Sequence, residues 1–465
     1  MKTTLWTIML LCAINNISAQ VKSQVKESFE LTSIAFRLAG AEEYINNTIP
    51  GYTADIDNYF SKYREHKLIS YIKKIREEQG IAYDAVPAAT GCIEIKRGKV
   101  IIDPQCDASK ISMIDSRWTE ESFRTFVRLL NDFYRQTKFK DFYTLHRGLY
   151  DIAETRLNTI LVDLNAEWFK SMFGEGPENT IVVASLCNGP GNYAFNGITK
   201  GEKRGIVIGC STDKEGNPAY SRFLITVIVH ELLHHYTNPC LAQYWSQIDS
   251  ASQIIYPHVK EKMAKLAYGS TNSTMIEWFN NLLTIMYFKA NRGFTATHLT
   301  AWRQHEGFIW MERSMTFMEH FRNHRNLYST IKDFMPEIVS FVNYTASDFD
   351  NVLKEYDNKE PYITDIFPIS NSILPLGIDT IQIRFSKPMF GAYGIRPLDD
   401  KRISPPYTDY QPFWKDKYTF CIILDRSKLE KGKTYGFKLN RAFFQSEKTY
   451  PMKEDFPYTF KMPDE

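Results

Sequence analysis

Residues 227–239 read VIVHELLHHYTNP, and this stretch decides how the rest of the chain is interpreted. Three histidines and one glutamate lie within positions 230–235, embedded in apolar residues. Helical spacing places His230 and His234 one turn apart on the same face. Glu231 then lies beside that face, about 100° around the axis. The pattern is HExxH, in which two imidazoles bind Zn²⁺ and the adjacent carboxylate takes a proton from a water molecule.

The neighbouring residues support a buried zinc-binding helix. His235 falls off the ligand face, so the spacing excludes it as a ligand. Two histidines and a glutamate are costly to bury unless they are paired or bind a metal. The pair Asn238-Pro239 is expected to end the helix. Two alternatives stay open: residues 223–229, FLITVIV, could form a buried strand with the histidines in a loop, or the histidines could be structural residues of a core helix.

A catalytic zinc site needs three protein ligands and one open position, so a third ligand is sought downstream. We favour Glu277, which forms a polar stripe with Asn281 and Thr284 on the otherwise apolar helix predicted over 272–290. Asn281 is placed to orient a neighbouring ligand. The alternative is that Thr274 and Glu277 form a capping box at a helix N-terminus. The other candidate ligands downstream are His258, Glu261, His298, His305 and Glu306.

A zinc peptidase also needs a donor that stabilises the developing oxyanion. The candidates are Tyr193, His258, Tyr268 and His305, and the sequence does not choose among them. Tyr193 lies in a Gly-Pro-Gly loop beside a predicted strand, where an extended substrate could align by β-addition.

The N-terminus is typical of a signal peptide over residues 1–19. Lys2 supplies the positive charge, and the apolar run 5–14 is too short to span a bilayer. A lipoprotein anchored through Cys12 is the alternative, but Leu11 is bulkier than the small residue expected there. No later apolar run is long enough for a transmembrane segment. We therefore expect a soluble exported chain, either periplasmic or extracellular.

The charge balance limits the classes of binding partner, and the number of cysteines bears on disulfide formation. The 56 Lys and Arg nearly cancel the 54 Asp and Glu without forming a basic block, which argues against nucleic acid. Outside the predicted signal peptide an even number of cysteines remains, with no CxxC pair. Disulfides and buried free thiols are both compatible with this pattern. These cysteines are Cys92, Cys106, Cys187, Cys210, Cys240 and Cys421.

The pattern along the chain predicts an α+β protein. Residues 20–355 read as a mainly helical domain that is interrupted by strands near 100, at 179–186 and at 204–209. The last two flank a turn-rich segment and predict a small sheet just before the histidine segment. Residues 356–361 are polar and contain a proline, as in a linker. Residues 362–465 show short alternating strands separated by turn residues, which predicts an antiparallel β-sandwich.

Several stretches resemble a family of secreted bacterial proteins known as a domain of unknown function, whose members look like gluzincin-type metallopeptidases. The resemblance covers most of 26–350 and rests on the order of five pieces along the chain. It implies a zincin-like fold, with His230, His234 and Glu277 as zinc ligands and Glu231 as general base. Residue 281 is asparagine where the family pattern more often has aspartate. The pieces are RLAGAEEY (37–44), YREHKLISYIKKIR (63–76), FYRQTKFKDFYTLH (133–146), VHELLHHYTNP (229–239) and IEWFNNL (276–282).

The C-terminal stretch FPISNSILPLGIDTIQIRFSKPM, residues 367–389, resembles the Ig-like modules appended to bacterial exported enzymes. Together the features predict an exported zinc metallopeptidase that acts on peptide or protein substrates. The C-terminal domain has two interpretations: it associates with the cell surface, or it only spaces and shields the peptidase. The alternative is a non-catalytic surface or binding protein that retains a peptidase-like core.

Overall fold

A computed structural model describes residues 21–197, 203–292, 294–406 and 412–464, so the predicted signal peptide and Cys12 lie outside the described residues. The chain divides into two compact units, Met1–Tyr236 and Thr237–Glu465. The boundary falls inside helix α10 (Leu224–Lys265), which carries the histidine motif. No helix among the described residues has the length and apolar character needed to cross a membrane.

The first unit contains a four-stranded sheet in the order β1-β4-β6-β5. Strands β1 (Ser23–Gln24), β4 (Thr180–Ala184) and β6 (Lys203–Ile208) are parallel, and β5 (Asn192–Gly197) is an antiparallel edge strand. The strands predicted at 179–186 and 204–209 are confirmed, but β5 replaces part of the predicted turn-rich segment. Phe195 explains the difference: its ring is buried 5.2 Å from that of Phe29, so alternate residues of this segment face the core.

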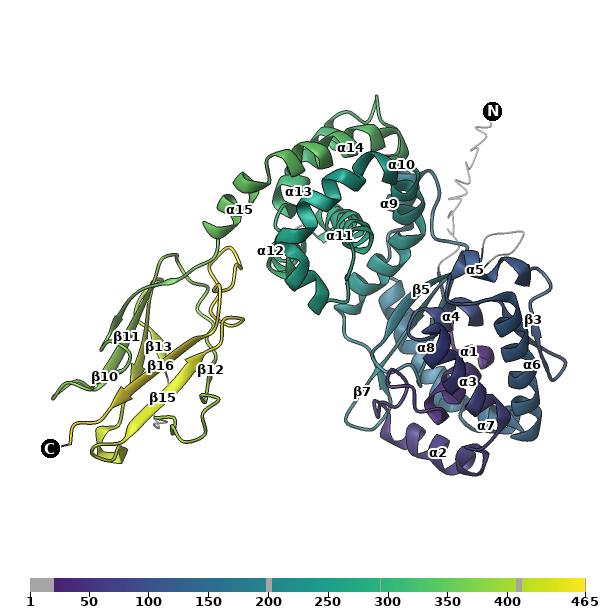
Figure 1. Cartoon of the computed structure of the whole chain (residues 1–465), viewed down its shortest axis with the longest axis horizontal. Coiled ribbons are helices and arrows are strands. Elements are labelled where there is room, and N and C mark those ends of the chain that lie inside the picture. The colour runs from purple at the N-terminus through teal and green to yellow at the C-terminus, as the bar shows by residue number, and fades with distance from the viewer. Residues whose placement is uncertain (1–20, 198–202, 293, 407–411, 465) are drawn as a thin grey trace, which may run out of the picture. The chain divides into compact units, whose positions relative to one another are not determined.

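Nine α-helices, two short 3-10 helices, two hairpins and the start of α10 complete the described part of this unit (Figure 1). Thr119 and Ser122 cap the start of the helix Glu120–Gln136, because the hydroxyl of each accepts from the main-chain N–H of the other. The helices are α1 (Glu27–Leu38), α2 (Pro50–Phe60), α3 (Lys67–Gln79), α4 (Ala85–Thr90), α5 (Ile111–Ile114), α6 (Glu120–Gln136), α7 (Phe139–Leu145), α8 (Arg147–Leu161) and α9 (Ala166–Phe173). The hairpins are β2 (Ile93–Lys96) with β3 (Lys99–Ile102), and β7 (Ser211–Thr212) with β8 (Pro218–Ala219).

In the second unit, α11 (Thr271–Arg292) lies in the middle of the helices that surround it (Figure 1). Trp278, Phe279, Leu282 and Leu283 are all at most 1% exposed, which explains why this helix is apolar around most of its circumference. The surrounding helices are α10, α12 (Phe294–Glu306), α13 (Met311–Asn323) and α14 (Ile331–Ser347), and α15 (Phe349–Asp357) follows.

The expected helix end at Asn238-Pro239 is wrong, because α10 continues through Pro239 and also through Pro257. An interior proline costs a helix roughly 3 kcal/mol, since it removes a main-chain hydrogen bond. Thr237, Cys240 and Leu241, on either side of Pro239, are each at most 3% exposed. Burial of these neighbours offsets the loss and keeps the helix continuous.

The C-terminal β-region forms two four-stranded sheets, β10-β16-β15-β12 and β13-β14-β11-β9. Most pairs are antiparallel as predicted, but β10 pairs with β16 in parallel, so one sheet is mixed. The predicted linker 356–361 begins within α15, and the Tyr356 hydroxyl donates to buried Glu360. The strands are β9 (Ile363–Phe367), β10 (Ser372–Ile373), β11 (Thr380–Phe385), β12 (Ile395–Arg396), β13 (Phe413–Trp414), β14 (Thr419–Ile423), β15 (Thr434–Leu439) and β16 (Phe456–Lys461).

Candidate metal centre

The rotation of α10 about its axis is set by His235 and Tyr236. His235 is 4% exposed, and its ring hydrogen-bonds the main chain of Gly205 on β6. Tyr236 stacks on Phe173 at the end of α9, with ring centroids 4.5 Å apart. Desolvation and the charge of Arg204 lower the pKa of His235 to about 3, so this ring is neutral at physiological pH. With His235 facing the sheet, the preceding residue His234 projects about 100° away.

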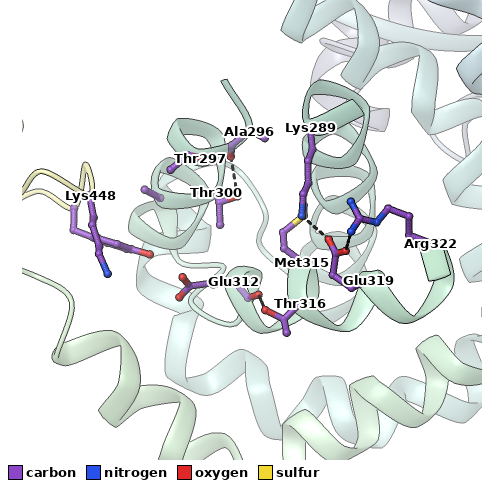
Figure 2. A pocket seen from close by; sticks show the side chains of 12 residues that line it. Lys289, Ala296, Thr297, Thr300, Glu312, Met315, Thr316, Glu319, Arg322 and Lys448 are labelled. Carbon is purple, nitrogen blue, oxygen red and sulfur yellow. Dashed lines mark hydrogen bonds and ion pairs between the residues drawn. The ribbon is translucent and has the colours of Figure 1, made fainter. Parts of the chain in front are cut away.

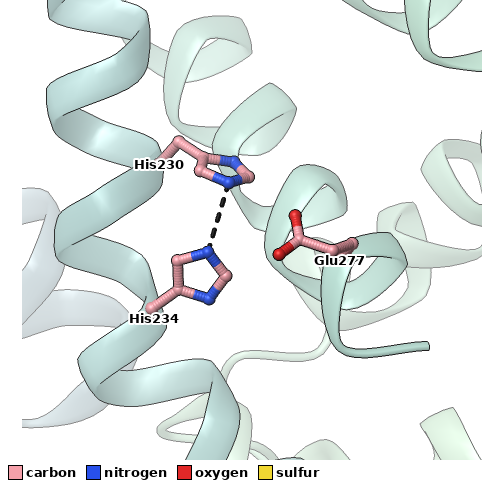
Figure 3. Close-up of side chains that lie close together, drawn as sticks. All are labelled: His230, His234 and Glu277. Carbon is pink, nitrogen blue, oxygen red and sulfur yellow. Dashed lines mark hydrogen bonds between the residues drawn. The ribbon is translucent and has the colours of Figure 1, made fainter. Parts of the chain in front are cut away.

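His230, His234 and Glu277 converge at one point (Figure 3). The Nε2 atoms of the two histidines are 3.2 Å apart. Each of the three residues offers one ligand atom, and these atoms all lie within 4.8 Å of one another. The Glu277 carboxylate comes from α11 and points toward the two imidazoles. No other such group occurs among the described residues.

This donor set fits a zinc ion. Zn–N bonds are about 2.0–2.1 Å long, so two ligands of a tetrahedral ion lie about 3.3–3.4 Å apart. The measured 3.2 Å between the imidazole nitrogens is close to that spacing. Two imidazoles and one carboxylate are also the ligand types of a three-ligand catalytic zinc site. The residues present therefore match the metal that the motif predicts.

The alternative role of Glu277 as a capping residue is wrong. The capping bonds at the start of α11 join Ser270 and Ser273, because each hydroxyl accepts from the other residue's main-chain N–H, both at 3.1 Å. Glu277 lies six residues after the first helical residue, Thr271. Its side chain is therefore beyond the reach of the N-terminal N–H groups.

A buried hydrogen bond joins the two ligand-bearing helices one turn beyond the ligands. The Thr237 hydroxyl on α10 donates to Asn280 Oδ1 on α11 at 2.9 Å, and both side chains are at most 1% exposed. The sequence reading missed this pair, although a buried asparagine in an apolar helix requires a partner. Asn281 donates from Nδ2 to the main-chain oxygen of Glu277 at 2.8 Å, so this bond holds the helix backbone rather than the carboxylate.

Two of the four candidate oxyanion donors, Tyr268 and Tyr193, interact with residues of the centre. The Tyr268 hydroxyl hydrogen-bonds the Glu277 carboxylate, and burial together with that charge raises the pKa of Tyr268. Tyr193 lies on edge strand β5 and not in a loop. Burial raises the pKa of Tyr193 to about 12, with smaller contributions from nearby carboxylates that include Glu231. The Tyr193 hydroxyl is therefore protonated at neutral pH and lies within electrostatic reach of the predicted general base.

The remaining candidate residues are engaged elsewhere or lie on the surface. His258 packs against Phe349 with ring centroids 5.1 Å apart. His305 Nε2 accepts from Arg441 at 3.0 Å, and Glu306 pairs with Arg303 at 2.6 Å. Glu261 and His298 are exposed. None of these residues belongs to the converging group.

A cavity of about 700 Å³ lies elsewhere in the second unit, lined largely by α12 and α13 (Figure 2). Within its lining, Glu319 pairs with both Lys289 and Arg322, and Glu312 pairs with Lys359, which lies outside the lining. None of the three converging residues lines this cavity. Its lining includes no histidine or cysteine, and its two carboxylates already pair with cations.

Comparison with known proteins identifies the family without a function. No curated protein and no solved structure matches the chain significantly. A family model matches residues 21–341, which include the whole of the converging group and end before the C-terminal β-region. The chain therefore belongs to the family described as a domain of unknown function, DUF4932.

Proposed function

We propose that this chain is an exported zinc metallopeptidase with a zincin-like catalytic domain. The observation that carries the proposal is the convergence of His230, His234 and Glu277, whose ligand atoms lie within 4.8 Å of one another on two consecutive helices. Two imidazoles and one carboxylate in such close approach are the ligand set that a zinc ion favours. An Ig-like C-terminal module that contacts the cell surface remains a prediction from the sequence.

Each residue of the centre has a distinct role in this proposal. His230, His234 and Glu277 hold the metal, which supplies Lewis acidity and lowers the pKa of water toward neutrality. Glu231 follows the first ligand directly and is only partly buried, so its carboxylate is open to solvent and would be the base for the water that the metal would activate. Glu231 accepts the proton of the attacking water and returns it to the leaving amine.

The tyrosines supply the hydrogen-bond donors. Tyr268 donates to Glu277, which orients the carboxylate toward the histidines. Tyr193 lies on an edge strand whose outer side has no partner strand within the described sheet. An extended peptide could add to such an edge through main-chain hydrogen bonds. Tyr193 would then be close to both the peptide and Glu231.

The metal content of the purified full chain tests the proposal first. We expect one zinc per chain by elemental analysis and loss of that zinc in His230→Ala. Zinc-free protein, or unchanged zinc in the variant, would contradict the site. This measurement also separates a zinc site from a histidine-rich structural core.

Activity is tested by Glu231→Gln, which keeps the size of the side chain and removes the base. We expect cleavage of a mixed peptide library to fall about 10²–10⁴-fold while zinc stays bound. Glu261→Gln, an exposed glutamate on the same helix, is the matched control and should be fully active. If wild type and Glu231→Gln are equally inactive while both bind zinc, the non-catalytic binding protein becomes the better explanation.

A further inference from the structure

A short hairpin in the first unit is built so that two cysteines meet. Strands β2 and β3 pair from Ile93↔Ile102 to Lys96↔Lys99. The turn residues Arg97 and Gly98 both have positive φ, 50° and 72°, as a tight two-residue hairpin requires. Asp103 N–H donates to the Cys92 oxygen at 2.9 Å, which extends the ladder by one residue pair.

The chain then folds back toward Cys92. Asp103 accepts twice: its main-chain oxygen from Cys106 N–H at 2.8 Å, and its Oδ1 from Gln105 N–H at 2.9 Å. This turn brings the Cys106 thiol within hydrogen-bonding range of the Cys92 thiol. Cys92 is 0% exposed, whereas Cys106 is partly exposed and open to a reagent from solution.

We propose that Cys92 and Cys106 are joined by a disulfide bond in the exported protein. The backbone already holds the two thiols together, and the bond closes a short loop around the hairpin. The oxidant is a disulfide of the thiol–disulfide exchange class, which is supplied in exporting compartments. By comparison, Cys187 and Cys210 are both buried at 0% and 4% exposure, which protects them from an external oxidant.

The exchange has two steps. The hydrogen bond with Cys92 and burial raise the pKa of the Cys106 thiol, so the small fraction of Cys106 that has lost its proton is the form that reacts. This thiolate attacks one sulfur of the oxidant, which releases one thiol and leaves a mixed disulfide on Cys106. Cys92 then attacks the Cys106 sulfur, which forms the Cys92–Cys106 bond and releases the second thiol. The oxidant takes up the two electrons and two protons that the cysteines lose, so the reaction is balanced.

Peptide mapping of the full chain tests the bond. The purified protein is equilibrated with oxidised and reduced glutathione, denatured, alkylated without reductant and digested with trypsin. We expect peptide 77–96 linked to peptide 100–110, with a mass two hydrogen atoms below their sum. Separate alkylation of the two peptides, or a link from either one to another cysteine, would overturn the proposal.

A reductant-dependent melting measurement gives a second readout. We expect the Tm of the oxidised wild type to fall by roughly 5–10 °C when a reductant is added, because a loop of this length is released. The double variant Cys92→Ser/Cys106→Ser should show no reductant dependence. Cys421→Ser, a cysteine of the C-terminal β-region, should respond as the wild type does. A wild type whose Tm does not respond to reductant would argue against a stabilising bond.

Discussion

Two carboxylates in helix interiors, Glu30 on α1 and Glu277 on α11, have opposite surroundings. Glu30 is 0% exposed and is surrounded by donors. Its Oε1 accepts from the Ser185 hydroxyl at 2.7 Å and from the Leu186 N–H at 2.9 Å, and its Oε2 accepts from Tyr52 at 2.7 Å. Both oxygens are bonded within the protein, so this carboxylate joins α1 to the segment after β4.

Glu277 is partly buried and accepts a hydrogen bond from Tyr268, and two imidazole nitrogens lie within 4.8 Å of its ligand oxygen. Nitrogen and oxygen lone pairs that converge in this way favour a bound cation. A buried acid alone therefore does not mark a functional site. The chemistry of its neighbours does: donors around Glu30 produce a structural network, and metal-ligating groups around Glu277 produce a candidate metal centre.

The largest expected difference between substitutions at the two carboxylates is in zinc affinity. In Glu277→Gln we expect zinc affinity to fall roughly 100-fold, or about 2.7 kcal/mol, because a neutral amide replaces an anionic ligand. Competition with a chromophoric chelator measures this change, and the Tm of the metal-free protein should change little. Glu30→Gln, the same substitution at the other carboxylate, should retain zinc. Equal zinc affinities in Glu277→Gln and Glu30→Gln would show that Glu277 is not a metal ligand.

The next effect is on stability. Glu30→Gln should lower the free energy of unfolding by about 1–3 kcal/mol, because the amide group places a donor where Glu30 has only acceptors. Chemical denaturation at pH 7 measures this loss. Unchanged stability would contradict the structural role assigned to the network.

We also expect the stability difference between wild type and Glu30→Gln to depend on pH, in a direction that the pKa of Glu30 sets. Burial is the largest cause of the raised pKa of Glu30, and the hydrogen bonds from Tyr52, Ser185 and Leu186 oppose it. A raised folded-state pKa adds stability that is complete below the unfolded pKa and is lost as the pH rises through the folded value. The stability of wild type relative to Glu30→Gln should therefore increase as the pH falls from 7 toward about 4.5. If the stability of wild type relative to Glu30→Gln instead decreases on acidification, the pKa of Glu30 is lowered by folding and not raised.

The smallest effect concerns the bond between the ligand-bearing helices. Thr237→Val keeps the shape and removes the hydroxyl that bonds Asn280, which should cost about 1 kcal/mol of stability. Zinc affinity should fall by up to about 10-fold if this bond positions the ligands. Thr284→Val is the matched control, because its hydroxyl donates to a main-chain oxygen of its own helix. Identical zinc affinities in Thr237→Val and Thr284→Val would show that the Thr237–Asn280 bond stabilises the fold without positioning the ligands.

Local patterns predicted much of this arrangement. The 3.6-residue period separated His230 and His234 from His235, and the structure places His235 against the sheet. The polar stripe on an apolar helix singled out Glu277, which converges with the two histidines. These inferences needed only the geometry of single helices.

Features that depend on tertiary packing were missed or misread. Pro239 suggests a helix end, but the burial of its neighbours overrides that local preference. The strand that carries Tyr193 was hidden by its Gly and Asn residues, because it is stabilised by pairing with β6 and not by its own residue types. The Thr237–Asn280 bond joins residues 43 positions apart, and no local period reveals such a partner.

The two prolines within α10 have a consequence for hydrogen exchange. Proline has no N–H, so Pro239 and Pro257 cannot donate the usual helical bonds to the main-chain oxygens of His235 and Gln253. The 42-residue helix is therefore continuous but has one main-chain hydrogen bond fewer at each proline. Local opening begins more readily where such a bond is missing, and the first of these places lies directly after the histidine motif. Amide protection around residue 239 should therefore be lower than in the uninterrupted turns of the same helix.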